Sequence, residues 1–168
     1  MQGARTMNVS VVAPGAIQLV GIKVVGRRSE LSHRVPLAWL ELLSRLDSIP
    51  GVVDRDVFHG CVPGSDHAQE DTDPVYQYWV TTAVRAVAAL PDGLKALAVP
   101  ARTYALTPVQ GGAEAIDAAY VQVAQWLDAQ GRRSDAESFV LERYDQRRQR
   151  VTPPYERFDY DLLTPLCP

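Results

Sequence analysis

The stretch AEAIDAAYVQVAQWLDAQ, residues 113–130, is the clearest helix of the chain, and the segments around it decide the fold. Its apolar residues recur at helical spacing and mark one buried stripe: Ile116, Tyr120, Val123 and Leu127, with Trp126 beside them. Gly131 follows as a C-terminal cap. RTYALTPV (102–109) precedes the helix, and SFVLERYD (138–145) and FDYDLLTPL (158–166) follow it, each with the composition of a strand. This half therefore runs strand, helix, strand, strand.

The first half of the chain repeats this order. A β-branched strand, IQLVGIKVVG (17–26), is followed by the polar connector RRSELSHR (27–34). Pro36 suits the first turn of a helix, so PLAWLELLSRLDSI (36–49) is predicted to begin there. Two more strands complete the half: VVDRDVFHGCV (52–62) and VYQYWVTTAV (75–84).

The repeat predicts one domain over residues 1–168, built of two pseudo-symmetric halves at about 8–88 and 93–166. Each half alone is a small sheet with one helix, which buries little apolar surface. We therefore expect an α+β fold in which duplicated strand–helix–strand–strand modules form an antiparallel sheet, with two main helices on one face. The ligand cleft is expected on the other face, along the seam between the halves, because pockets favour such internal interfaces.

Composition narrows the classes of partner. The chain has 168 residues, a net charge of -3 and scattered arginine pairs, and so lacks the basic stripe of a protein that binds nucleic acid directly. No window approaches 18 consecutive apolar residues, which argues against a membrane span. Two cysteines and the absence of a signal-peptide pattern favour a cytoplasmic protein.

Glu142 is the unusual residue of the strand FVLERYD (139–145), because alternation places this carboxylate between Val140 and Tyr144 on one face. Burying an isolated carboxylate is unfavourable, whereas a cationic ligand would supply its missing partner. Aromatic rings add cation–π attraction. The candidate rings are Tyr78, Trp79, Tyr104 and Tyr144, and Tyr78 and Trp79 face opposite ways. The alternative from spacing alone is an edge glutamate paired with Arg143 or Arg102.

Several stretches in this order resemble the gyrase-inhibitor-like (GyrI-like) domain, found as the effector-binding domain of bacterial transcription activators. They are LVGIKVVGR, PLAWLELLSRLDSIPGVVD, YQYWVTTAV, LPDGLKALAVPARTYAL, AYVQVAQWL, ERYD and FDYDLLTPL. The resemblance implies a duplicated (SHS2) fold, a bacterial source and a link to transcription regulation. It also implies a cleft for bulky, lipophilic, often cationic molecules, whose charge faces a glutamate that the ERYD match places at Glu142.

Metal and catalytic chemistry find little support. The loop HGCVPGSDHAQEDTD (59–73) is rich in candidate ligands, but its spacing matches no zinc or calcium template, so we expect a solvated acidic loop that could act as a lid. Cys61 lacks the surroundings of a nucleophile, and no nucleophile-elbow motif is present. We therefore expect no metal, no cofactor and no catalytic residue. Asp159 and Asp161 face away from Tyr160 and are expected to be an exposed pair.

The leading hypothesis is a stand-alone protein that binds small lipophilic cations, with a regulatory or resistance role. Its predicted ligand contacts are Glu142, Tyr144, Trp79, Tyr78, Tyr104 and Trp39, although Trp39 also lies on the apolar stripe of its helix. Two alternatives stay open: a hydrolase of reactive lipophilic natural products acting in the same cleft, and a protein-interaction module of the gyrase-inhibitor type. A homodimer or a separate regulatory protein is the further partner considered.

Overall fold

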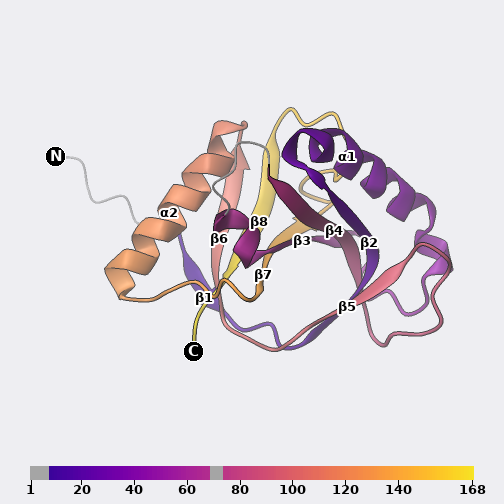
Figure 1. Cartoon of the computed structure of the whole chain (residues 1–168), viewed down its shortest axis with the longest axis horizontal. Helices are drawn as coiled ribbons and strands as arrows, with labels where there is room; N and C mark the ends of the chain where they lie inside the picture. The colour runs from indigo at the N-terminus through magenta and orange to yellow at the C-terminus, as the bar shows by residue number, and fades with distance from the viewer. Residues whose placement is uncertain (1–7, 69–73) are drawn as a thin grey trace.

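Antiparallel strands form one eight-stranded sheet in the order β1-β6-β8-β7-β3-β4-β2-β5 in a computed structural model, which describes residues 8–68 and 74–168 (Figure 1). The strands are β1 Ser10–Val12, β2 Ile17–Arg27, β3 Val57–Pro63, β4 Val75–Val84, β5 Lys95–Val99, β6 Tyr104–Gly111, β7 Phe139–Asp145 and β8 Phe158–Pro165. The long helices are α1 Arg28–Ser44 and α2 Glu114–Gln130, and short 3₁₀ turns are η1 Leu46–Ser48 and η2 Gly64–Ala68. The predicted α+β class is confirmed.

The sheet shows the predicted duplication. Counted outward from the seam, the first half contributes β3, β4 and β2, and the second contributes β7, β8 and β6 in the same relative places. The seam is the antiparallel pair β3–β7, in register from Val57↔Asp145 to Pro63↔Phe139. The short strand that precedes each half pairs with the other half: β1, before the first half, pairs with β6, and β5, before the second half, pairs with β2.

Helix α2 has the predicted extent, and α1 does not. Gly131 ends α2 in the left-handed conformation, with φ 64°, and its N–H bonds the carbonyl of Asp128. The polar segment before Pro36 is helical rather than a connector, because α1 begins at Arg28. The Glu30 carboxylate accepts a hydrogen bond from the Arg27 backbone N–H at 3.2 Å, which closes the first turn. Pro36 lies inside the helix and removes one helical hydrogen bond.

The strand predicted at residues 52–62 is shorter than expected. It begins at Val57 rather than at residue 52, because Asp54 accepts a hydrogen bond from the Asp56 N–H and forms a turn. Val52 keeps only an isolated bridge to Val84. The predicted acidic loop is in part a 3₁₀ turn at Gly64–Ala68, and its Glu70, Asp71 and Asp73 lie outside the described residues.

The sheet has two unlike faces. One face is covered by both helices, with α1 over β2 and β4 and α2 over β6 and β8 (Figure 1). On the other face an apolar cluster joins residues of both halves, from the edge strand β5 to β6 beside the other edge: Leu19, Cys61, Trp79, Val99, Tyr104, Leu141 and Leu163. Because this cluster includes residues of both outer regions, the sheet is curved around it.

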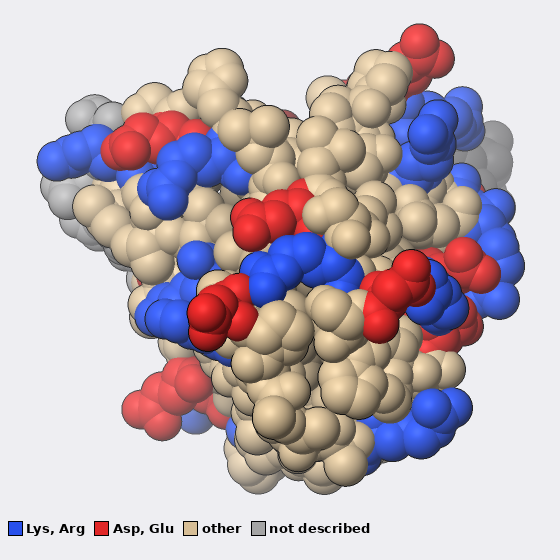
Figure 2. Space-filling model, turned by 90° about the vertical axis from the view of Figure 1, so that its right-hand side faces the viewer, with Lys and Arg blue, Asp and Glu red and all other residues tan. Residues whose placement is uncertain are grey.

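Charged side chains are interspersed on the side of the molecule shown in Figure 2, where basic and acidic groups alternate among uncharged ones rather than forming a patch of one sign. None of the helices in the described part of the chain is long and apolar enough to span a membrane.

Candidate ligand-binding site

Glu142 lies in the middle of β7, on the face that the helices cover. The Tyr78 hydroxyl donates a hydrogen bond to its Oε1 at 2.5 Å, and the Tyr144 hydroxyl donates to the same oxygen at 3.1 Å. Tyr78 comes from β4 in the first half of the chain, two strands away from β7. The structure thus brings together three of the residues predicted for the site, drawn from both halves.

Gly60 makes this arrangement possible. It faces Glu142 across the seam and Val80 on the other side. A Cβ atom at this position would lie 2.0 Å from the Tyr78 Oη and 3.0 Å from the Glu142 Oε1. The missing side chain therefore leaves the space that the tyrosine hydroxyl occupies. Gly60 was not among the residues predicted for the site, although a glycine inside a strand pattern is a known sign of close approach.

Among the described residues, the Glu142 carboxylate has no positively charged partner. None of the ion pairs among the described residues includes Glu142, since Arg143 pairs with Asp161 at 2.9 Å and Arg102 pairs with Asp135 at 2.6 Å. The alternative of an edge glutamate paired with one of these arginines is therefore wrong.

Burial raises the pKa of Glu142 above its ordinary value of 4.5, and the hydrogen bonds donated by Tyr78 and Tyr144 oppose this shift. Burial, with the nearby Glu142 charge, raises the pKa of each of these tyrosines well above 10.0. At neutral pH both hydroxyls therefore keep their protons and act as donors. The site therefore holds a carboxyl group that is hydrogen-bonded by two tyrosines and has no ion-pair partner among the described residues.

A cavity of about 370 Å³ adjoins these tyrosines. Its walls come from α1, β4, β7 and the segment after β7: Arg28, Leu31, Ser32, Val35, Pro36, Trp39, Tyr78, Tyr144, Gln149, Val151, Tyr155 and Phe158. Trp39 meets Tyr144 edge to face, with ring centroids 5.9 Å apart, and meets Tyr78 in the same way at 6.5 Å. Glu142 does not line the cavity itself and acts on it through the two tyrosines that do.

The structure separates Trp79 and Tyr104 from this cavity. Both are buried in the apolar cluster on the other face, because alternation along β4 turns Trp79 away from Tyr78. The cleft was expected on the face away from the helices, whereas Glu142, Tyr78 and Tyr144 lie on the face that the helices cover, where α1 supplies Trp39. A different cavity does open on the opposite face, without any of these four residues.

The segment between β7 and β8 forms one wall of the cavity and was not predicted to do so. Val151 is buried, Gln149 accepts a hydrogen bond from the Asp159 N–H, and Tyr155 stacks on Phe158 with centroids 6.0 Å apart. These contacts depend on how a loop folds back over α1, which leaves no periodic signal in the sequence.

The candidate metal ligands of residues 59–73 can be followed only in part, because Glu70, Asp71 and Asp73 lie outside the described residues. His59 and Cys61 are buried in β3, and the described residues contain no group of three or more His, Cys, Asp or Glu side chains that could hold a metal ion. Burial raises the pKa of the Cys61 thiol to about 12, so the thiolate is not formed at neutral pH.

Comparison with known proteins agrees with this fold. A family model described as GyrI-like small molecule binding domain matches residues 7–166. Three solved structures show the same fold at low sequence identity. The structure of SAV2435 bound to tetraphenylphosphonium has a TM-score of 0.67 at 14% identity, over 95% of this chain and 93% of that chain.

The EcmrR chain in an EcmrR–DNA complex has a TM-score of 0.71 at 14% identity, over 96% of this chain and 59% of that chain. A hydrolase encoded by lin2189 from Listeria innocua has a TM-score of 0.55 at 12% identity, over 96% and 92%. No curated protein matches the chain.

Proposed function

The chain belongs to the family of GyrI-like small molecule binding domains, and from its site we propose that it binds lipophilic cations in the cavity beside Glu142. The observation that carries the proposal is the Glu142 carboxylate, which lies next to an aromatic cavity without a cation partner among the described residues. The binding of tetraphenylphosphonium by the neighbour SAV2435 supports the same class of ligand.

The proposed binding combines apolar contact with charge. Trp39, Tyr78 and Tyr144 offer ring surfaces, and a cation over such a ring gains about 0.5–2 kcal/mol. Glu142 adds a longer-range attraction, since its carboxylate lies one hydroxyl group away from the cavity. Two unit charges about 6 Å apart in an effective dielectric of about 20 attract by roughly 3 kcal/mol, which corresponds to about a hundredfold in affinity.

The test compares a cation with a neutral molecule of similar shape. Tetraphenylphosphonium and triphenylphosphine oxide are titrated by calorimetry into the parent protein and into Glu142→Gln. Glutamine keeps an oxygen for the tyrosine hydroxyls and removes the charge. We expect the variant to bind the cation roughly a hundredfold more weakly and the neutral compound with little change.

An equal loss for both compounds would point to a distorted cavity rather than a lost charge. An unchanged affinity for the cation would refute the role of Glu142. A tenfold excess of tetraphenylphosphonium over its dissociation constant should also raise the unfolding free energy of the parent by about 1.4 kcal/mol.

Hydrolysis in the same cavity is a second candidate function. It is favoured by the raised pKa of Glu142, which suits a carboxyl group that exchanges a proton with a bound ligand through the hydroxyl of Tyr78 or Tyr144. The neighbour from Listeria innocua described as a hydrolase shares the fold. This function predicts a product of altered mass from many equivalents of a reactive lipophilic compound, whereas binding without turnover would exclude it for that compound.

The use of the bound ligand is part of the proposal. We propose that binding in the cytoplasm either signals to a regulatory partner or holds a toxic compound, as an effector or resistance protein would. The fold shared with the EcmrR chain of a DNA complex supports a regulatory link. Size-exclusion chromatography with and without tetraphenylphosphonium tests whether the ligand changes the assembly of the protein.

A further inference from the structure

A row of four polar side chains crosses the middle of the sheet on the face away from the helices. Thr81 of β4, His59 of β3, Arg143 of β7 and Asp161 of β8 are direct cross-strand neighbours in the pairs His59↔Thr81, His59↔Arg143 and Arg143↔Asp161. The adjacent row on the same face is apolar and belongs to the core: Trp79, Cys61, Leu141 and Leu163. Asp161 is only 7% exposed, so its expected place in an exposed pair is wrong.

A cavity of about 460 Å³ opens over this polar row. One side of it is apolar, lined by Ile17, Val53, Val57 and Ala83. The other side is polar, lined by His59, Arg143, Asp161, Arg148, Asp145 and Asp54. None of these residues lines the cavity beside Glu142, which lies on the opposite face of the sheet. These two cavities are therefore separate, and they lie on opposite sides of β7.

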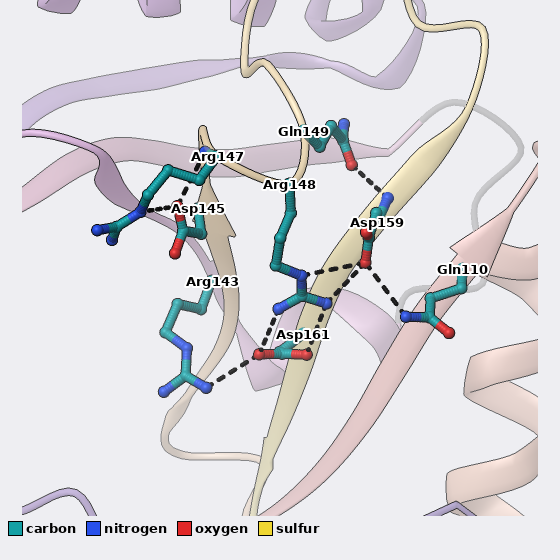
Figure 3. Close-up of polar contacts among 8 residues, drawn as sticks. All are labelled: Gln110, Arg143, Asp145, Arg147, Arg148, Gln149, Asp159 and Asp161. Carbon is teal, nitrogen blue, oxygen red and sulfur yellow. Dashed lines mark hydrogen bonds and ion pairs between the residues drawn. The ribbon is translucent and has the colours of Figure 1, made fainter.

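The charged groups of this second cavity are paired with one another (Figure 3). Arg148 lies between two carboxylates and bonds Asp159 at 2.7 Å and Asp161 at 3.2 Å. Arg143 bonds Asp161 from the other side at 2.9 Å. Arg147 bonds Asp145 at 2.8 Å and Asp54 at 2.9 Å. A charged ligand would have to displace an ion pair that already exists, whereas a neutral ligand would not.

His59 is the polar group of the row that has no partner. Its side chain is 6% exposed, and its Nδ1 is buried without a hydrogen-bond partner among the described residues. Burial, with the positive charge of Arg143, lowers the pKa of His59 to about 4, so the ring is neutral at pH 7. A neutral imidazole offers one donor and one acceptor. A buried nitrogen without a partner is unfavourable for stability, and a bound molecule that supplies the missing hydrogen bond would explain its presence at a cavity.

From this geometry we propose a second small-molecule site for a neutral, hydrogen-bonding compound of the carboxamide type. Its amide meets the polar row at His59 and Arg143, and its apolar part packs against Ile17, Val57 and Ala83. The site does not depend on the cation site at Glu142, because the two lie on opposite faces of the sheet. The two faces differ in chemistry: an unpaired carboxylate selects cations, and a set of paired charges selects neutral polar molecules.

The test uses three probes of one shape and different charge: benzamide, benzoate and benzylammonium. Binding is followed by saturation-transfer NMR and by the ¹⁵N shifts of the His59 imidazole. We expect benzamide alone to bind here and to move the His59 signals, with the same affinity in the parent and in Glu142→Gln. Benzylammonium binding that disappears in Glu142→Gln would belong to the other cavity and would agree with the proposal.

Two variants separate the polar row from the space above it. His59→Leu removes both ring nitrogens and should weaken benzamide binding at least tenfold, while the unfolding midpoint stays equal or rises because an unpaired buried nitrogen is lost. Ala83→Leu fills the cavity from its apolar side, leaves His59 in place and should also abolish binding. If His59→Leu fails to fold, the proposal is tested by whether benzamide still moves the His59 imidazole signals in Ala83→Leu.

Three results would overturn the proposal. The first is a lack of benzamide binding to the parent, and the second is tighter binding of benzoate than of benzamide with His59 shifts, which would indicate an anion site. The third is benzamide binding that survives both variants or disappears in Glu142→Gln. Failure of the cation site, by contrast, would appear only with tetraphenylphosphonium.

Discussion

Gly60 is the position at which one added methyl group tests the geometry of the Glu142 site. A Cβ atom here would lie 2.0 Å from the Tyr78 Oη and 2.7 Å from its Cζ. Real Cβ contacts of this length do not occur, so the Tyr78 ring in Gly60→Ala must move off the carboxylate. The backbone of Gly60 is paired on both sides in the sheet and has little freedom to move instead.

The expected loss follows from the hydrogen bond that this movement breaks. Tyr78 donates to Glu142 at 2.5 Å, and a hydrogen bond to a charged group contributes about 1.5–3 kcal/mol. The hydrogen bond from Tyr144 remains. We therefore expect Gly60→Ala to lower the unfolding free energy by about 2 kcal/mol, which for a chain of this length lowers the melting temperature by roughly 4–8 °C. The displaced ring should also enter the cavity and weaken tetraphenylphosphonium binding.

Urea unfolding followed by circular dichroism measures the loss, and Gly26→Ala is the matched control. Gly26 is also a strand glycine, but the one close contact of a Cβ there would be the end of the flexible Arg34 side chain, at 2.9 Å, since Glu30 lies at an ordinary contact distance of 3.6 Å. The control should stay within about 0.5 kcal/mol of the parent. In a Tyr78→Leu background the ring is absent, so most of the loss caused by Gly60→Ala should disappear, giving a coupling energy of about 1–2 kcal/mol.

Two outcomes would refute this reasoning. One is a Gly60→Ala protein as stable as the Gly26→Ala control. The other is an equal loss with Tyr78 and with leucine at position 78, which would mean that the glycine serves the strand pairing and not the tyrosine.

Three further predictions concern the same cavity and its wall. Folding raises the pKa of Glu142, so the protonated carboxyl group stabilises the fold below about pH 4.5, and this stabilisation is lost as the pH rises through the folded-state pKa. Urea unfolding at a series of pH values should therefore show the parent losing stability relative to Glu142→Gln as the pH rises. Arg148→Ala removes the ion pairs that tie the segment after β7 to the partly exposed Asp159 and the buried Asp161, and should lower the unfolding free energy by about 1 kcal/mol at low salt and less at high salt. An equal effect of the exposed control Arg150→Ala would exclude this anchoring role. Trp39→Phe should remove most of the fluorescence change caused by tetraphenylphosphonium, while Trp126→Phe, outside the cavity, should retain it.

Local patterns predicted most of the elements. The strands at 75–84 and 139–145 have the bounds expected from their aromatic and β-branched content, and α2 ends at Gly131 as its capping chemistry predicts. The predicted start of α1 at Pro36 was wrong, because the helix already begins at Arg28, where the Glu30 side chain caps its first turn. A proline inside a helix is tolerated when the packed apolar face compensates for one lost hydrogen bond, and local sequence does not show that packing.

The site could be predicted only in part, because it too depends on contacts between segments that the local sequence does not show. Alternation along β7 places Glu142 and Tyr144 on one face, and the structure agrees. The choice between Tyr78 and Trp79 required the register of β4 against β3, which depends on contacts between strands that the chain pattern does not specify. The role of Gly60 depends on the same register.

Both candidate sites are properties of the seam, and neither half of the chain contains either of them. Glu142, from the second half, needs Tyr78 and the space above Gly60, from the first half. On the other face Arg143, also from the second half, lies beside His59 from the first. The adjacent seam pairs Gly60↔Glu142 and His59↔Arg143 thus serve opposite faces, because successive side chains of a strand point in opposite directions. A shift of one residue in this pairing would turn every side chain of β7 to the wrong face relative to its partners, so the register of the seam fixes both sites at once.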